Sequence, residues 1–433
     1  MIVGLTVANF RSIRDQTTLN LAADYLGTHL RGNVAHPAGV KNGVIKSAGI
    51  YGANGSGKSN LLQAFEALQY IVSASGNLEQ GDPIGYYEPF RLSAQTKNAP
   101  VRFDVRFLTP DGIRYRYKVA FTRNRITEEQ LTYYPSNRPA VLFTREASDA
   151  GEAIKFGSRF KGGKKRLRIF PNNAYLSKAG GRSDAPDFLR SVFDYFLWDV
   201  VRFARYERLI LRGWNEIEEL VRQVAALLAF ADTGIDTVTV AERNPDSLQP
   251  PEDTDAESTA DDRRDTQWKF LASHKTDSGA LEQFELNEES AGTRRLFELA
   301  PVLLDAFSTG GVVLIDELES SMHPFTAELI IKLFNDPDVN PKGAQLIFTT
   351  HNVQLMSPEL LRRDQIWFAE KSQGASRYYS LAEFDKNVVK PRSPFSRWYL
   401  EGRFNAIPKI DYQKIVSLLK ASKTSRVENA RKS

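Results

Sequence analysis

Eight consecutive residues, Gly52-Ala53-Asn54-Gly55-Ser56-Gly57-Lys58-Ser59, constrain this chain more than any other segment. They match the phosphate-loop pattern G-x-x-x-x-G-K-[ST] at every position. Strand-like residues 44–50 precede the loop, and apolar residues at helical spacing follow it. A chance Gly/Ser loop would have neither flank. We therefore predict a strand, a glycine-rich turn and a helix whose amino terminus binds phosphate.

The residue types in this loop each have a chemical reason. Glycines let successive backbone N–H groups point at a β-phosphate, and the helix dipole adds to that attraction. Lys58 is expected to neutralise the β- and γ-phosphates, and Ser59 to hold Mg²⁺. The other residues expected to contact the nucleotide are Asn54, Gly55, Ser56, Gly57 and Asn60.

A second segment, residues 311–317, is an apolar strand that ends in the carboxylates Asp316 and Glu317. A buried parallel strand delivers side chains at its carboxyl end, where ligands of such sheets bind. Asp316 is expected to bind Mg²⁺ through water, and Glu317 to polarise the attacking water as general base. The alternative is an ordinary strand that runs into a solvated acidic turn.

A third segment, residues 345–350, is also strand-like and ends at His351. A histidine at the carboxyl end of a strand in the same sheet can reach a γ-phosphate and hold the water, although a lone histidine is more often structural. For His323, before Pro324, the structural alternative stays open, and a place at a dimer junction is the other interpretation.

Residues 289–295 lead into a predicted helix over 293–307. Ser290, Gly292 and a bare helix amino terminus can form a second anion site, although Ser290 alone is indistinguishable from an ordinary N-cap. In a chain that already has a phosphate loop, a second phosphate-binding helix tip is most simply explained by ATP held between two copies of the chain.

Strands and helices alternate at both ends of the chain. Towards the carboxyl end the pattern predicts a strand at 312–315, a helix after Pro324 and a strand at 345–349. This alternation predicts an α/β fold with one sheet built from distant segments. Residues 186–230 have a helical pattern, and residues 100–145 are rich in strands with a turn at Asp111-Gly112. The expected division is an amino-terminal ATPase lobe, an inserted strand and helical subdomain, a flexible acidic loop, a carboxyl-terminal ATPase lobe and a basic tail, over residues 1–120, 121–243, 244–266, 267–410 and 411–433.

Composition excludes several functions. The 433 residues include no cysteine, which excludes disulfides and thiolate metal sites and fits the cytoplasm. No apolar stretch is long enough to span a bilayer, and no signal peptide is recognisable, so no membrane partner is expected. A net charge of +4 is too mild to indicate nucleic-acid binding by itself.

One local basic patch, interleaved with Phe156, Phe160 and Phe170, makes a nucleic acid a further candidate partner. A solvated loop is the alternative interpretation. The patch consists of Arg159, Lys161, Lys164, Lys165, Arg166 and Arg168.

Taken in chain order, the four segments resemble ABC-type ATPases: phosphate loop, Ser-x-Gly signature, Asp-Glu strand and switch histidine. The opening Asn9-Phe10-Arg11-Ser12-Ile13 resembles that of the SMC, RecF and OLD ATPases. Three segments are similar to the stand-alone AAA/ABC ATPases of bacterial abortive-infection and anti-phage operons, including relatives paired with RloB-type partners and those of PARIS and Septu systems. These segments are residues 289–296, 316–319 and 349–352, and the tail at 363–368 and 399–408 agrees. The resemblance covers roughly residues 1–75 and 268–410.

The resemblance implies a P-loop NTPase head, with a mixed sheet flanked by helices and an inserted β-hairpin and helical subdomain. It implies ATP and Mg²⁺ as ligands, a homodimer or higher oligomer, Arg11 near the nucleotide, and Ser290 and Gly292 on ATP held by the partner copy. Gln95 is the candidate for the family's glutamine loop. Too few residues follow His351 for the nuclease domain of OLD proteins, so a toxic activity is expected in a separate TOPRIM- or RloB-like effector encoded nearby.

Two functions follow as hypotheses. The first is an ATPase that senses a phage trigger and controls a partner effector in abortive-infection defence. The alternative is an SMC- or RecF-like ATPase of DNA repair or maintenance that binds DNA directly. A transporter's ATPase subunit is disfavoured by the Asn9-Phe10-Arg11 opening.

Overall fold

A computed structural model of the chain describes residues 1–24, 29–136, 138–148, 151–165, 167–203, 218–231, 233–242, 268–408 and 411–419. The expected acidic loop at 244–266, Arg166 of the basic patch and most of the basic tail lie outside these described residues.

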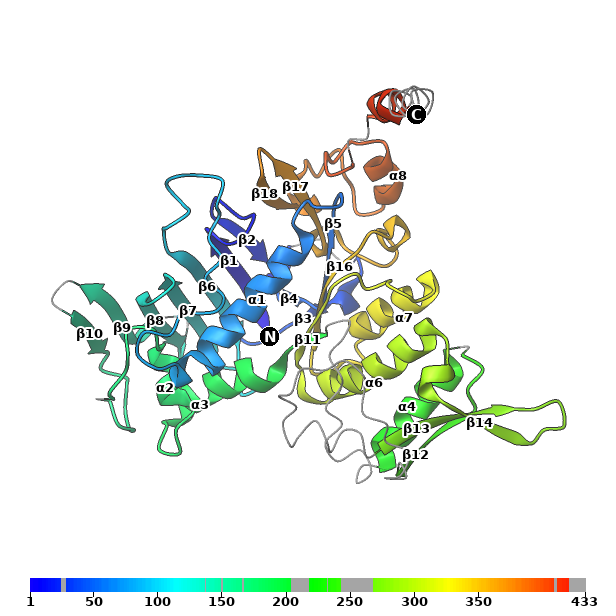
Figure 1. Ribbon diagram of the computed structural model, residues 1–433, viewed down its shortest axis with the longest axis horizontal. Coiled ribbons are helices and arrows are strands. Elements are labelled where there is room, and N and C mark those ends of the chain that lie inside the picture. Colours follow the sequence, from blue (N-terminus) through cyan, green and yellow to red (C-terminus); the bar gives the residue numbers. More distant parts are fainter. Residues whose placement is uncertain are drawn as a thin grey trace, which may run out of the picture.

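The phosphate loop follows a strand of a six-stranded mixed sheet with the order β11-β15-β16-β5-β17-β18 (Figure 1). Neighbouring strands are parallel except β18, which is antiparallel to β17. The sheet confirms the strands predicted at 312–315 and 345–349. Its strands are β5 (Ser47–Tyr51), β11 (Val200–Phe203), β15 (Val312–Ile315), β16 (Gln345–Thr349), β17 (Ile366–Ser372) and β18 (Ala375–Ser380).

Helices cover both faces of this sheet. Because side chains alternate along a strand, Val312 and Leu314 of β15 pack in the cluster that contains α1 (Lys58–Ser73). Val313 and Ile315 pack in the cluster that contains α6 (Ala291–Thr309) and α7 (Pro324–Asn335). Burial on both faces explains why these strands are continuous apolar runs. The helices predicted after the phosphate loop, at 293–307 and after Pro324 are confirmed.

The second sheet has seven antiparallel strands in the order β10-β9-β8-β7-β6-β1-β2, and α1 lies between it and the first sheet (Figure 1). The turn predicted at Asp111-Gly112 joins two of these strands. Their bounds are β1 (Ile2–Ala8), β2 (Thr17–Asn20), β6 (Val101–Leu108), β7 (Arg114–Phe121), β8 (Ile126–Tyr134), β9 (Ala140–Ser148) and β10 (Gly151–Phe156).

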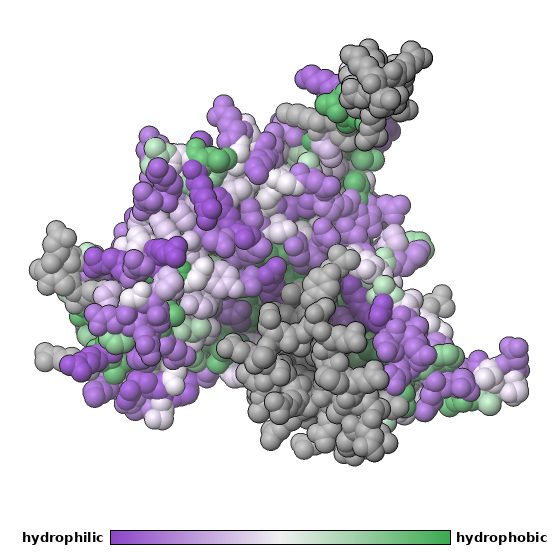
Figure 2. Space-filling view, viewed as in Figure 1, coloured by the Kyte–Doolittle hydropathy of each residue, from purple (hydrophilic) through white to green (hydrophobic). Residues whose placement is uncertain are grey.

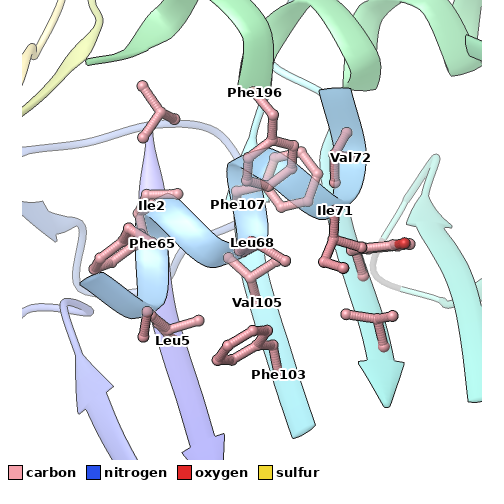
Figure 3. Packing of buried hydrophobic residues seen from close by; sticks show 14 of the residues in the cluster. Ile2, Leu5, Phe65, Leu68, Ile71, Val72, Phe103, Val105, Phe107 and Phe196 are labelled. Carbon is pink, nitrogen blue, oxygen red and sulfur yellow. The ribbon is translucent and has the colours of Figure 1, made fainter. Parts of the chain in front are cut away.

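Figure 3 shows how α1 is held there: its apolar face packs on β1, β6 and the aromatic ring of Phe196. The contacting residues are Phe65, Leu68, Ile71 and Val72 of α1, Ile2 and Leu5 of β1, and Phe103, Val105 and Phe107 of β6. The helix that begins at Lys58 is therefore anchored along its length, which gives the phosphate loop a rigid support.

The helical pattern over 186–230 is interrupted, and that prediction is wrong in its middle. A helix, α3 (Asp187–Asp194), and a π-helical turn (Tyr195–Asp199) lead into β11, which pairs in parallel with β15. Helix α4 (Glu218–Phe230) follows residues 204–217, which are outside the described residues. Val200 and Phe203 are buried in the six-stranded sheet, so pairing with β15 overrides the local helical pattern.

The expected boundary between residues 120 and 121 falls inside β7, which is hydrogen-bonded to β6 on one side and β8 on the other. The inserted strands β8 to β10 therefore extend the sheet that begins with β1. This boundary cuts a continuous antiparallel ladder, and the middle of the chain also contributes β11 to the phosphate-loop sheet.

A small sheet of β12 (Thr237–Glu242), β13 (Trp268–Lys275) and β14 (Leu281–Glu285) packs with α4 against α6, and its β13–β14 hairpin projects from the body (Figure 1). The remaining elements are short: β3 (Val34–Ala35), β4 (Val44–Ile45), α2 (Tyr175–Gly180) and α8 (Phe395–Leu400). Figure 2 shows a mainly hydrophilic face with small, separated hydrophobic groups. Within the described ranges, no helix has the length and apolar character needed to cross a bilayer.

Candidate active site

The phosphate loop connects β5 to α1, and its backbone adopts conformations that favour glycine. Gly55 has φ 72° and Gly57 has φ 103°. A Cβ at Gly57 would lie 2.3 Å from Ser376 Oγ, whereas a Cβ at Gly55 would meet no atom within 4 Å. Gly57 is thus required both by its backbone angle and by close packing, and Gly55 by its angle alone.

Strand β18 supports the loop from outside. Ser376 Oγ donates to the Ser56 carbonyl at 2.6 Å, and Tyr378 Oη donates to the Gly57 carbonyl at 2.6 Å. Burial raises the pKa of Tyr378, so its hydroxyl stays a donor. These two hydrogen bonds tie the backbone of Ser56 and Gly57 to β18. Sequence analysis missed both residues, because nothing local links positions 376 and 378 to the loop.

Lys58 is buried at the start of α1. Its Nζ donates to the carbonyls of Gly52 at 3.0 Å and Ala53 at 3.3 Å. Burial lowers the pKa of Lys58, while the negative charges of Asp316, Glu317 and Glu319 act to raise it. The ammonium group therefore lies in the field of three carboxylates.

Ser59 and Asp316, 257 positions apart in the chain, are in direct contact. Ser59 Oγ donates to Asp316 Oδ1 at 2.9 Å, and Thr349 Oγ1 donates to the same oxygen at 2.6 Å. The contact exists because β5, β15 and β16 are parallel neighbours whose carboxyl ends meet at one edge of the sheet. A hydroxyl and a carboxylate oxygen at this spacing are the hard oxygen donors that Mg²⁺ prefers, so the residues present fit that ion.

Glu317 follows with an exposed side chain and a left-handed backbone, φ 50°. Its N–H donates to Thr349 Oγ1 at 2.8 Å. Positive φ is uncommon for a residue with a side chain and here sits beside the paired Ser59 and Asp316. One threonine hydroxyl thus binds both Asp316 and the backbone of Glu317.

His351 lies directly after β16, and its side chain is exposed. It lines a cavity of about 360 Å³ together with Gly52, Thr350 and residues of the carboxyl-terminal segment, Tyr399 and Ile407. The first glycine of the phosphate loop and His351 therefore border one space.

Ser290 is the N-cap of α6: its Oγ accepts from the Thr293 N–H at 3.1 Å. The side chain is exposed, and a Cβ at Gly292 would lie 2.6 Å from the Ser321 carbonyl. The helix tip thus packs closely on the turn after β15. Among the described residues, no hydrogen bond joins Ser290 to the phosphate loop of its own chain, so a role for Ser290 and Gly292 on a nucleotide stays a prediction.

Arg11 lies beside the amino-terminal turns of α1. It has φ 52°, and its guanidinium donates to Glu88 and Gln63, with a longer contact of 3.4 Å to Asn60 Oδ1. Asn60 Nδ2 in turn donates to Ser12 Oγ at 2.5 Å.

A pocket of about 310 Å³ opens next to this group. It is lined by Arg11, Ser12, Glu88, Pro89, Phe90, Arg91, Leu92, Lys371 and Gly374. Basic, acidic and apolar side chains thus meet in one pocket, and its Arg11 contacts Asn60 of α1.

Two other candidates have ordinary structural contacts. Gln95 is exposed and accepts from Ser93 Oγ at 2.6 Å, with no hydrogen bond to Ser59 or Asp316. His323 is the N-cap of α7, and its Nδ1 accepts from the Phe325 N–H at 3.2 Å. Neither contact involves the group around Lys58.

The described basic residues of the patch are exposed, whereas two of its three aromatic residues, Phe156 and Phe160, pack on the core. Phe160 is buried and packs edge-on against Phe156, and both lie near Tyr175. Lys165 Nζ lies 5.5 Å from the Phe160 ring. Phe170 is 37% exposed, so one ring of the three is accessible. A single accessible ring favours a solvated loop over a platform for successive bases.

Sequence comparison agrees with this geometry. A family model described as "AAA domain, putative AbiEii toxin, Type IV TA system" matches residues 47–357, which contain the phosphate loop, Asp316, Glu317 and His351. This chain belongs to that family of AAA domains.

Two solved structures are similar to this AAA-family chain. The SMC head domain from Thermotoga maritima shares 14% identity over 88% of this chain and 98% of the other, with a TM-score of 0.40. The recombination mediator protein RecF in its ATP form shares 13% identity over 87% and 97%, with a TM-score of 0.38. No curated protein matches in sequence. Identities and TM-scores this low do not indicate the function of this AAA domain.

Proposed function

We propose that this AAA domain binds and hydrolyses ATP with Mg²⁺ between two copies of itself, and so controls a partner effector in abortive-infection defence. The ATPase proposal rests on one observation: Ser59 and Thr349 both donate to the same Asp316 oxygen, and the buried Lys58 lies in the field of that carboxylate. A chance loop and a chance acidic turn would have no reason to meet across the sheet.

The residues suit an in-line attack of water on a γ-phosphate. Lys58 would exchange its contacts with loop carbonyls for phosphate oxygens, and Ser59 and Asp316 would hold Mg²⁺. When bound, Mg²⁺ supplies positive charge to the phosphate oxygens. Glu317, exposed and fixed through its backbone, would accept a proton from the attacking water, with His351 nearby.

The pocket lined by Arg11 and Leu92 is suited to the ribose and base of the nucleotide. It shares Arg11 and Ser12 with the network around Asn60, so a ligand that has its phosphates at the amino terminus of α1 would extend into it. The mixture of cationic and apolar residues fits a heterocycle with polar edges.

The link to a defence system is inferred from the family description, which names a putative toxin of a toxin–antitoxin system. We propose a separate polypeptide of TOPRIM or RloB type as the partner effector. Co-purification of the AAA domain with the product of an adjacent gene, stronger with ATP than without, would support this partner. A folded AAA domain that does not bind that product, with or without ATP, would contradict it.

The ATPase proposal is tested with two variants. Lys58→Ala should abolish binding of a fluorescent ATP analogue, because it removes the ammonium group that lies on the carbonyls of the loop. Glu317→Gln should bind the analogue normally yet hydrolyse ATP about 100-fold more slowly, since it removes only the base. Phosphate release and analogue binding are measured on the same preparations. Normal turnover in Glu317→Gln would contradict the assigned base.

A further inference from the structure

The turn after β15 and the turn after β16 are joined by one carboxylate that the reaction outlined above does not use. Glu319 Oε2 accepts from Thr350 Oγ1 at 2.6 Å, and Glu319 Oε1 accepts from the His351 backbone N–H at 2.6 Å. Each oxygen thus binds a different donor of the same short segment. Hydrogen bonds to a charged acceptor at this length are among the stronger ones in proteins.

His351 has few other anchors. Its side chain is exposed, and the imidazole ring makes no hydrogen bond within the residues that the structure describes. Thr350, directly before it, is fully buried and donates its N–H to the Ile50 carbonyl at 3.2 Å. The position of the ring is therefore set by its backbone, and Glu319 binds that backbone.

The turn that carries Glu319 is itself held firmly. The Glu317 N–H binds Thr349 Oγ1 and the Leu318 N–H binds the Thr349 carbonyl at 3.0 Å, while Leu318 is fully buried. Glu319 therefore lies on a rigid turn after β15, and its carboxylate holds the turn after β16 in place.

We propose that Glu319 is a positioning residue for the reaction, which holds His351 at the nucleotide site through the His351 backbone. This inference rests on the proposed ATPase function. It assigns Glu319 no contact with ATP, water or Mg²⁺, and it predicts that removing Glu319 harms hydrolysis only as far as His351 contributes to it.

The kinetic test is a double-mutant cycle. Glu319→Gln keeps the shape but leaves one acceptor for two donors, so kcat should fall about 10- to 100-fold, as expected when a catalytic group is displaced slightly. The dissociation constant of the ATP analogue should not rise, because Glu319 acts on Lys58 only through its negative charge, and loss of that charge favours binding of an anion. His351→Ala should lower kcat similarly, and the double variant should be no slower than His351→Ala. Additive losses, or an unchanged kcat in Glu319→Gln, would overturn the proposal.

A second readout does not depend on hydrolysis. Hydrogen–deuterium exchange of a peptide that covers residues 350–353 should speed up about tenfold or more in Glu319→Gln, because the His351 N–H loses its acceptor. A peptide covering β15 should be unchanged. Unaltered exchange at 350–353 would refute the anchoring role whatever the protein hydrolyses. Inactive wild-type protein with the expected exchange change would instead refute the proposed ATPase function and leave the anchor intact.

Two further variants guard against a merely structural effect. Thr350→Val removes one of the two donors and retains the Glu319 carboxylate, so it serves if Glu319→Gln does not fold; its kcat loss should also vanish in a His351→Ala background. Glu328→Gln is the matched control, since Glu328 is a surface acid of α7 paired with Lys332. A loss of kcat in Glu328→Gln as large as that in Glu319→Gln would count against a specific role.

Discussion

Lys46 and Lys58 are two buried ammonium groups at opposite ends of β5, and they differ in what compensates their burial. Lys46 is 4% exposed and Lys58 6%. Lys58 binds two carbonyls and lies near three carboxylates, whereas Lys46 donates to one carbonyl, that of Asn340, at 3.4 Å. Burial lowers the pKa of Lys46, with a smaller opposing effect from Asp336. The buried Lys46 ammonium group, with this little compensation, lowers the free energy of unfolding.

We predict that Lys46→Met stabilises the protein by about 1 kcal/mol at pH 7, because it keeps the packing and removes the buried charge. In the wild type, the folded chain loses the Lys46 proton at a lower pH than the unfolded chain. Between the lowered pKa and 10.5 the unfolded state binds more protons, so stability attributable to Lys46 rises with pH.

Urea unfolding of both proteins from pH 7 to pH 10 measures this difference, which should shrink as pH rises. Lys332→Met, at an exposed lysine of α7, is the control and should leave the pH dependence unchanged. A less stable Lys46→Met at neutral pH would show that the contacts with Asn340 and Asp336 outweigh desolvation.

At the scale of an element, the phosphate loop combines two different constraints. Gly55→Ala adds only the strain of a left-handed alanine, about 1–2 kcal/mol. Gly57→Ala adds the same strain and a clash with Ser376, so it should be less stable by at least about 1 kcal/mol more and should lose ATP-analogue binding. Thermal unfolding and analogue titration measure both effects.

The clash can be relieved independently. Ser376→Gly removes the nearest atom, Ser376 Oγ at 2.3 Å, and leaves Ser12 Oγ at 2.8 Å, so it should recover only part of the stability lost in Gly57→Ala and none of that lost in Gly55→Ala. Equal destabilisation by the two glycine variants would mean that β18 does not press on the loop.

Helix α6 offers a second element-scale test, because Ser290 is both an N-cap and a proposed nucleotide contact. Ser290→Ala should cost about 1 kcal/mol by loss of the cap. Ser290→Thr keeps the capping oxygen and should restore stability, but its extra methyl group at an exposed helix tip should still lower kcat/KM for ATP. If threonine restores both quantities, Ser290 is a cap and nothing more.

At the scale of the whole molecule, the proposed site needs two chains. In the proposed dimer, each nucleotide takes its phosphate loop from one copy and its α6 tip from the other. A two-fold dimer makes both sites identical.

This arrangement predicts complementation. Lys58→Ala lacks the loop's cation, and Ser290→Arg blocks the helix tip, so each variant alone should be inactive. An equimolar mixture should regain about a quarter of wild-type ATPase activity, because half of the random dimers contain one intact site. The two variants are mixed with ATP so that they exchange subunits, and ATPase activity is then measured by phosphate release. If no activity appears, the site is not shared between two copies.

Much of the fold was predictable where a local pattern carried its own signal. The phosphate loop, the strands at 312–315 and 345–349 and the helix after Pro324 were predicted with their approximate bounds, since buried parallel strands are short apolar runs with clear ends. The contact of Ser59 with Asp316 follows from the rule that parallel strands bring their carboxyl ends to one edge.

Predictions failed where a distant partner decided the conformation. Val200-Val201 lies in a helical pattern, yet β15 pairs with it as a strand. The boundary at residue 120 cuts the ladder between β6 and β8, because no local signal distinguishes a strand that starts an insertion from one that extends a sheet. The place of Gln95 in a glutamine loop stays a prediction, since its observed hydrogen bond, from Ser93 Oγ, does not test it.

The sequence alone determined which chemistry this AAA domain can attempt, because glycines, a lysine, a serine and two carboxylates at those spacings are local features that need no partner to be recognised. Only the tertiary structure decided which residues hold that chemistry in place: Ser376 and Tyr378 behind the loop, Thr349 on Asp316, and Glu319 on His351. Such contacts join residues that lie far apart in the chain, and their geometry exists only once the sheet has aligned its strands.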